Sequence, residues 1–173
     1  MGQLGDVARR IQASQLSEQA WSPFGWLPLE DTDDRDGSSR LQFDWSDVHV
    51  NLIRHLPDEV TRLDGGLRCD VMYRHDTHTQ VLMPLNCDCV IAVAPAQVEL
   101  SKAADLDSVR AFLVRPLESL VLDRGTWHWG PFPLGHEAVR LFNVQGMRYS
   151  EDNRCADLGG RNLAVEVLFP PLG

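Results

Sequence analysis

Lysine is almost absent from this sequence, in which Lys102 stands alone. Lysine and arginine together number 16 against 25 aspartates and glutamates, which gives a net charge of -9. A nucleic-acid-binding surface needs clustered positive charge to displace counterions from phosphates, so this balance argues against one. The positive charge that is present lies on arginine, whose planar guanidinium can hold a carboxylate through two parallel hydrogen bonds. The composition therefore favours a small anionic ligand over nucleic acid.

Long apolar runs and a disulfide framework are also missing. No uninterrupted apolar stretch approaches the ~18 residues of a membrane span, and no basic region precedes an apolar core at the N-terminus, so we expect no export signal. The cysteines have no spacing typical of disulfides, and we predict reduced thiols in a cytoplasmic protein. They are Cys69, Cys87, Cys89 and Cys155. Zinc at Cys87 and Cys89 is disfavoured because no second pair of ligands accompanies them.

Short strand-like segments dominate the chain, separated by turns rich in Gly, Pro and Asp. Segments with a helical period are scarce, although Ser17 could cap one short helical turn. This pattern predicts an all-β, mainly antiparallel sandwich or barrel with a few short helices. At 173 residues we expect one domain over residues 1–173, with residues 1–8 frayed. Expected strands include Val48–Ile53, Leu67–Arg74, Thr79–Leu85 and Ala138–Val144.

One stretch, Leu122–Pro131, combines a turn, a histidine and two tryptophans. Gly125 allows a turn at positive φ, and Trp127 and Trp129 flank His128. A histidine fixed among apolar walls is one arrangement of a small-molecule site. The alternative is a buried histidine that is satisfied by a backbone carbonyl beside two core tryptophans. The stretch alone does not decide between these interpretations.

A second polar cluster runs from Arg74 to Gln80. On an extended chain His78 and Gln80 share one face. About 50 residues separate His78 from His128, which is the separation of facing strands in one half of a double-stranded β-barrel. The cupin pattern fits this order, so we expect the two clusters to share a cavity. The remaining histidines are interpreted as surface or hydrogen-bonded strand residues: His49, His55 and His136.

Two of these segments resemble motifs of the ureidoglycolate lyases. They are Arg74–Leu85 (RHDTHTQVLMPL) and Gly125–His128 (GTWH), and Ala20–Gly25 and Val109–Phe112 give weaker matches in the same order. The resemblance extends over about residues 10–158. It implies a cupin-like double-stranded β-helix barrel, usually a homodimer, that cleaves ureidoglycolate to glyoxylate and urea in allantoin and purine breakdown.

The resemblance also implies roles for individual residues. His75 and His128 are expected as the acid and base, with Gln80 orienting the ureido group and Arg74 holding the substrate carboxylate. Further substrate contacts are expected from Thr79, Arg124, Trp127 and Arg140. The alternative is a divalent metal, nickel above all, bound by His75, His78, Gln80 and His128. Gln80 stands where metal-binding cupins usually have Glu, and its amide is a weaker donor than a carboxylate.

One departure from the family pattern concerns the substrate. Ureidoglycolate lyases usually have an Asp-Arg pair where this chain has Gln145-Gly146. If that pair holds the substrate carboxylate, Arg140 or Arg148 is the nearest replacement, although neither falls on the motif position. A relative that acts on another small hydroxy or oxo acid, as a metal-dependent oxygenase or isomerase, is therefore one alternative. A cupin that binds a ligand without catalysis is another.

Overall fold

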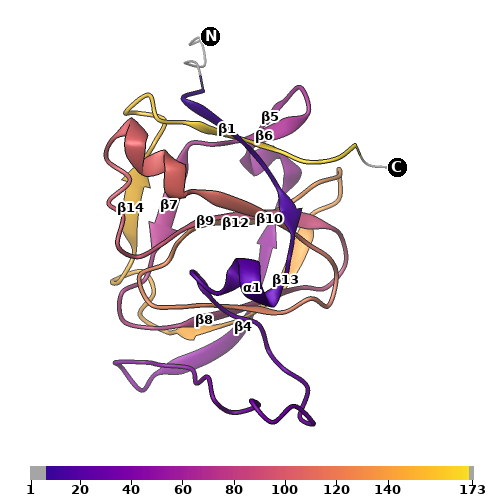
Figure 1. The fold of residues 1–173 in the computed structure, drawn as a ribbon, viewed down its shortest axis with the longest axis vertical. Coiled ribbons are helices and arrows are strands. Elements are labelled where there is room, and N and C mark those ends of the chain that lie inside the picture. The colour runs from indigo at the N-terminus through magenta and orange to yellow at the C-terminus, as the bar shows by residue number, and fades with distance from the viewer. Residues whose placement is uncertain (1–6, 172–173) are drawn as a thin grey trace.

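Three β-sheets stack on one another in the computed structural model, which describes residues 7–171 (Figure 1). The expected single domain and frayed N-terminus include residues 1–6, 172 and 173, which lie outside the described residues. The helices are short: α1 (Glu18–Trp21) and the 3-10 helices η1 (Pro57–Glu59) and η2 (Ala103–Ser108). Ser17 caps α1 as expected, because its side chain accepts a hydrogen bond from the backbone N–H of Ala20 at 3.2 Å.

The first sheet has the order β1 (Arg9–Gln12), β15 (Val165–Leu168), β6 (Gly66–Cys69) and β5 (Thr61–Leu63). The second sheet has the order β14 (Arg154–Asp157), β7 (Val71–Arg74), β12 (Trp127–Pro133), β9 (Cys89–Ala94), β10 (Arg110–Val114) and β2 (Ser14–Gln15). The third has the order β3 (Gly25–Trp26), β11 (Leu120–Leu122), β8 (Gln80–Pro84), β13 (Val139–Gly146) and β4 (Val48–His55). All pairings are antiparallel except β1 with β15 and β2 with β10. The predicted all-β, cupin-like fold is confirmed.

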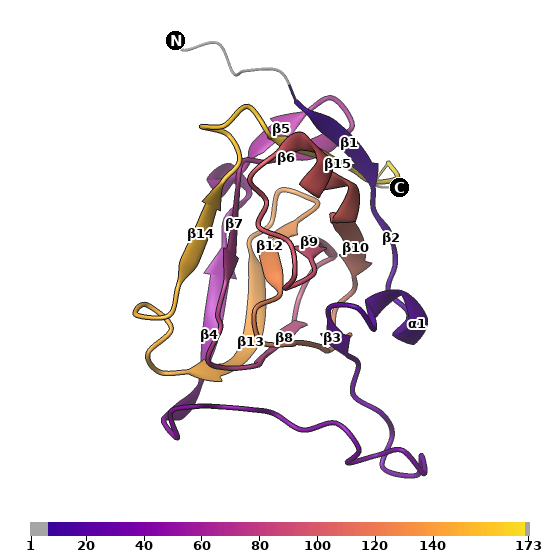
Figure 2. The same cartoon turned by 60° about the vertical axis from the view of Figure 1, so that its left-hand side comes forward.

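The middle sheet separates two apolar cores. Strand β9 lies at its centre, and all six of its residues are buried because both of its faces are covered. Val90 and Ala92 pack toward the first sheet, in a cluster with Leu67 and Val167. Ile91 and Val93 pack toward the third sheet, in a cluster with Leu82 and Leu141. Figure 2 shows β7 and β14 on the side of the molecule where β4 and β13 also lie.

The expected strand Leu67–Arg74 is wrong in one respect, because it is two strands in two different sheets. It breaks at Asp70 into β6 and β7. Leu67 and Cys69 are buried in the core, whereas Val71 and Tyr73, which continue their alternation, line a cavity. A single bend therefore changes which face of the chain is buried. Within residues 7–171, no helix has the length and apolar character needed to cross a membrane.

Candidate active site

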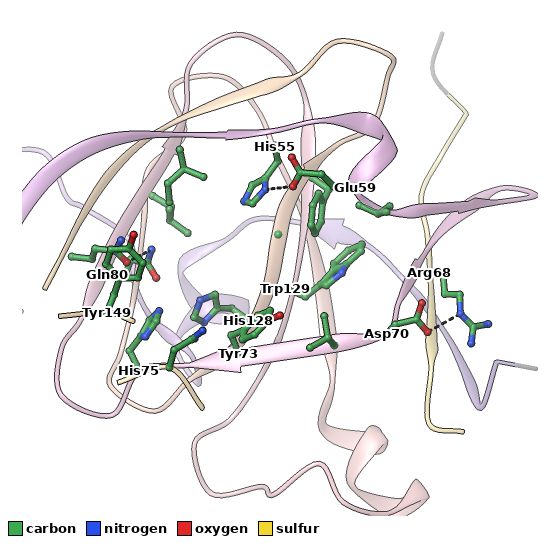
Figure 3. A pocket seen from close by; sticks show the side chains of 18 of the residues that line it. His55, Glu59, Arg68, Asp70, Tyr73, His75, Gln80, His128, Trp129 and Tyr149 are labelled. Atoms are coloured by element: carbon green, nitrogen blue, oxygen red, sulfur yellow. Dashed lines mark hydrogen bonds and ion pairs between the residues drawn. The ribbon is translucent and has the colours of Figure 1, made fainter. Parts of the chain in front are cut away.

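A cavity of about 390 Å³ lies between the second and third sheets (Figure 3). Strands β4, β8 and β13 provide one wall, and β7 and β12 provide the other. A β-bulge between Trp129 and Phe132 shifts the register of β12, so that both of these side chains line the cavity, as His128 does. One end of the cavity has a cluster of polar residues: His75, His128, Gln80, Gln145, Tyr149 and Asn153.

Three histidines cluster at the polar end of the cavity. His75 and His78 come from the loop between β7 and β8, and His128 comes from β12. The ring centroids of His75 and His128 are 5.4 Å apart, and those of His75 and His78 are 4.7 Å apart with the rings stacked. Gly125, at a φ of +75°, makes the turn before β12, and its N–H donates to the carbonyl of His75 at 2.7 Å. The two sequence motifs are therefore joined directly.

Hydrogen bonds to the backbone fix the tautomers of two of these histidines. Nδ1 of His75 lies 2.8 Å from the carbonyl oxygen of Asp152, and Nδ1 of His128 lies 3.1 Å from that of Thr126. A carbonyl can only accept, so Nδ1 carries the proton in each neutral ring. Nε2 of both rings is then unprotonated and carries a lone pair that can accept a proton. Both histidines line the cavity, and each is set up to accept a proton.

Burial keeps all three imidazoles neutral. Burial, together with the neighbouring His75, lowers the pKa of His128 to about 3. Burial likewise lowers the pKa of His78 to about 4 and shifts the pKa of His75 downward, although the contact of His75 with Asp152 opposes that shift. His128 keeps some accessible surface only because it faces the cavity. At neutral pH the cluster therefore offers proton acceptors and no positive charge.

A layer of side-chain amides faces the histidines. Nε2 of Gln80 donates to Oδ1 of Asn143 at 2.8 Å and to Oε1 of Gln145 at 3.2 Å. Asn143 in turn donates to Asn51 at 2.7 Å, so the chain of amides crosses β8, β13 and β4. This pattern orients Gln80 and leaves its Oε1 buried with no hydrogen-bond partner. An unpaired buried acceptor is costly, so this oxygen is suited to receive an N–H from a ligand.

The loop after β13 completes the site through Asp152. Its carboxylate accepts hydrogen bonds from the backbone N–H and the hydroxyl of Thr77 at 2.7 and 2.5 Å, and from the N–H of Asp76 at 3.1 Å. The same carboxylate lies 3.8 Å from Nδ1 of His78. Burial alone would raise the pKa of Asp152, but the bonds from Thr77 and Asp76 hold it below its ordinary value. Sequence analysis missed this residue because no motif surrounds it.

The expected metal ligands do not converge in this arrangement. The rings of His75 and His78 are stacked at an interplanar angle of 20°, and a ring nitrogen donates along its own ring plane, so their lone pairs run side by side. Nε2 of His78 is buried without a hydrogen-bond partner, but this residue does not line the cavity. Among residues 7–171, no group of three His, Cys, Asp or Glu side chains is placed to hold a metal ion. The expected ligands, as they are arranged here, therefore do not fit a bound metal ion.

Three of the expected substrate contacts are engaged elsewhere in the protein. Arg74 stacks over the ring of Trp127 at 4.8 Å and pairs with Asp76 at 3.1 Å. Trp127 is buried in the core, where its indole N–H donates to the carbonyl of Val98. Thr79 exchanges hydrogen bonds with the backbone of Gln42. None of the three lines the cavity.

The other two expected contacts also lie outside the cavity lining. Arg124 pairs with Asp44 at 2.5 Å. Arg140 is exposed on the outer face of β13, opposite Arg54 of β4. The polar groups that do line the cavity near His75 are instead Tyr73, Tyr149 and Asn153.

His55 is a further cavity residue, and its interpretation as a hydrogen-bonded strand residue is confirmed. Its Nδ1 lies 2.9 Å from the carboxylate of Glu59, and its ring contacts that of Phe132 with centroids 4.8 Å apart. His55 and Glu59 line the end of the cavity opposite His75 (Figure 3). The signal was present in the alternation of β4, which places Ile53 and His55 on one face.

Comparison with known proteins gives one decisive finding. No curated protein matches the chain significantly. A solved structure of a dTDP sugar isomerase from Desulfovibrio desulfuricans G20 is 14% identical and covers 76% of this chain and 73% of its own, with a TM-score of 0.44. The model of the ureidoglycolate lyase family matches residues 33–162, a span that contains the three histidines and the amide layer. The chain belongs to the ureidoglycolate lyase family, which is a family of enzymes.

Proposed function

We propose that this enzyme cleaves ureidoglycolate to glyoxylate and urea, with the neutral imidazoles of His75 and His128 as its proton-transfer groups. Membership of the family supports the reaction. The observation that carries the assignment of residues is the pair of Nδ1-to-carbonyl hydrogen bonds, which leave Nε2 of both rings unprotonated. A base is the group that this reaction needs first.

The reaction can be written as one proton moving from oxygen to nitrogen. The hydroxyl of ureidoglycolate gives its proton to Nε2 of His75 or His128, and the carbonyl of glyoxylate forms as the bond from carbon to the ureido nitrogen breaks. The departing nitrogen takes the bond electrons and receives the proton from the imidazolium. Burial lowers the pKa of His128 to about 3, which makes its imidazolium a ready proton donor and its neutral ring a weak base. Such general acid-base catalysis is worth roughly 10²–10⁴-fold.

Substrate binding falls to the groups that face the histidines. Oε1 of Gln80, buried and unpaired, is assigned to accept a hydrogen bond from the ureido group, as the sequence suggested. The carboxylate is assigned to the hydroxyl and amide donors of Tyr73, Tyr149 and Asn153, which line the same end of the cavity. This replaces the assignment to Arg74, whose guanidinium packs against Trp127.

The test is release of urea and glyoxylate from racemic ureidoglycolate by the purified, folded protein. We expect release well above the spontaneous rate, and a loss of 10²-fold or more in kcat for His128→Ala and for His75→Ala. The matched control is His136→Ala, at an exposed histidine outside the cavity, which should keep full activity. Urea release at the spontaneous rate alone would overturn the proposed reaction, and full activity in His128→Ala would overturn its role.

A nickel-dependent reaction is the competing use of the same residues. It would need His78 to leave its stacked position beside His75, so that the lone pairs of the two rings converge. Dialysis against a chelator, followed by metal analysis and addition of Ni²⁺, distinguishes the nickel-dependent reaction from proton transfer by the imidazoles alone. Proton transfer by the imidazoles alone predicts that the dialysed enzyme keeps its activity. Loss of activity that Ni²⁺ restores would favour the metal.

We also propose a homodimer that acts in the cytoplasm, in allantoin and purine breakdown. The outer face of the edge strand β4 exposes Val48, Val50 and Leu52 at 45%, 60% and 52%. A long apolar edge strand without cover is an association or aggregation site. The four free cysteines fit a reducing compartment. A monomer by light scattering at micromolar concentration would count against the dimer.

A further inference from the structure

The cavity is larger than ureidoglycolate, and part of its wall is chemically unlike that substrate. Ureidoglycolate has about nine non-hydrogen atoms, which at the roughly 30 Å³ of one water molecule in the liquid fill at most about 270 Å³. The cavity measures about 390 Å³. Roughly a third of it is therefore left when the substrate lies against His75 and Gln80. That remainder has walls of its own.

The remaining part of the cavity has an apolar and aromatic section of wall. It is formed by Ile53, Val60, Leu82, Trp129 and Phe132. Leu82 and Trp129 are 1% and 5% exposed, and Trp129 packs against Phe132 with ring centroids 4.8 Å apart. In Figure 3 Trp129 lies between His128 and the Arg68–Asp70 pair. Ureidoglycolate has no apolar group that these walls could bury.

The polar residues at the far end are already matched to one another. Glu59 accepts from His55 and from the backbone N–H of Leu56 at 2.8 Å. Arg68 donates to Asp70 at 2.7 Å. Because the carboxylate of Glu59 already accepts these hydrogen bonds and Asp70 is paired with Arg68, the polar groups of this end are engaged with one another. An apolar substituent is the group that the apolar section of wall accommodates best.

We propose that this part of the cavity is a side-chain subsite, and that the enzyme takes ureido adducts of 2-oxo acids larger than glyoxylate. In such a substrate, R–C(OH)(COO⁻)–NH–CO–NH₂, an apolar R group projects from the reacting carbon into the subsite while Gln80 holds the ureido group. The inference rests on the proposed function, because it uses the same reaction. The hydroxyl proton passes through an imidazole to the departing nitrogen, the C–N bond breaks, and the products are urea and the 2-oxo acid R–CO–COO⁻.

Binding of stable analogues tests the subsite without turnover. N-carbamoylglycine is ureidoglycolate without the hydroxyl, and N-carbamoylleucine adds a branched side chain on the same carbon. We expect calorimetric titration to show tenfold or tighter binding of the leucine compound, since even one methylene in an apolar pocket is worth about tenfold or more. Equal or weaker binding of the leucine compound would overturn the proposal.

A filling variant shows where the side chain binds. Val60→Trp places a large ring in the subsite, and should reduce the preference for the leucine compound to less than threefold. The matched control, Gln97→Trp, adds the same ring at an exposed position outside the cavity and should keep the preference. A preference that survives in Val60→Trp would overturn the location.

Turnover separates this proposal from the one on which it rests. Urea release from ureidoglycolate with no preference between the analogues overturns the subsite and leaves the lyase reaction standing. A clear preference without urea release supports the subsite and overturns the lyase reaction. Release of urea from the adduct of 4-methyl-2-oxopentanoate, at a kcat/KM at least equal to that for ureidoglycolate, is the result expected if both hold.

Discussion

The backbone carbonyl of Asp152 accepts a hydrogen bond from Nδ1 of His75 at 2.8 Å, while the carboxylate of the same residue binds the loop that carries His75 and His78. One residue therefore fixes the tautomer of His75 with its main chain and the path of the histidine loop with its side chain. Asp152 is a positioning residue, since it does not line the cavity.

Asp152→Asn should lower kcat about tenfold with little change in KM. The amide offers one acceptor oxygen in place of two and loses its charge, so the hydrogen bonds from Thr77 and Asp76 weaken. His75 then loses its fixed orientation while the substrate-binding groups stay in place. Steady-state urea release measures kcat and KM. Glu151→Gln, at the exposed neighbouring position, is the control, and a rise in KM at constant kcat would contradict the positioning role.

Gln80→Ala should lower kcat/KM about tenfold, mainly through KM. The substitution removes the unpaired Oε1 that we assign to the ureido group, and one neutral hydrogen bond is worth about 0.5–1.5 kcal/mol. Gln97→Ala is the matched control at an exposed glutamine outside the cavity. The assignment fails if Gln80→Ala binds N-carbamoylglycine as tightly as the wild type does.

The parts of the site that sequence reasoning found are those fixed by local chemistry. Gly125 has the expected positive φ, and the turn that it makes links the two predicted motifs through the carbonyl of His75. The alternation of strands β8 and β12 was enough to bring Gln80 and His128 to one cavity. Short-range geometry of this kind can be read from turn residues and from the period of a strand.

What sequence reasoning could not find depends on bends and on distant partners. The break at Asp70 decides that Tyr73 faces the cavity and Arg74 the core, and no pattern in Leu67–Arg74 marks it. Arg74 therefore stacks on Trp127, 53 positions away, instead of facing the substrate. Asp152 acts across 77 positions on His75, and its neighbours in the sequence give no sign of that role.

The departure from the family pattern at Gln145-Gly146 leads to another prediction. Oε1 of Gln145 accepts from Gln80, and a Cβ on Gly146 would come within 3.0 Å of Nδ1 of His78. Gly146→Ala should therefore destabilise the protein by about 1–3 kcal/mol through overpacking. Chemical denaturation measures this loss. If the ring of His78 is the cause, the same substitution should cost little in a His78→Ala background; an equal cost in both backgrounds would place the clash elsewhere.

The buried neutral histidines also predict how stability depends on pH. His78 has a pKa of about 4 in the folded protein, against about 6.5 when unfolded. Between these values the unfolded chain binds the proton and the folded one does not, so the free energy of unfolding rises with pH. For His78 this amounts to about 3 kcal/mol, present above pH 6.5 and lost as the pH falls to 4.

Denaturation of the wild type and of His78→Gln at several pH values isolates this contribution from that of the carboxylates. The stability difference between the two proteins should shift by about 3 kcal/mol across the window in favour of the wild type at higher pH. His136→Ala, at an exposed histidine, should follow the wild type throughout. A constant difference between the wild type and His78→Gln would mean that the pKa of His78 is the same in the folded and unfolded protein, and would contradict the lowering by burial.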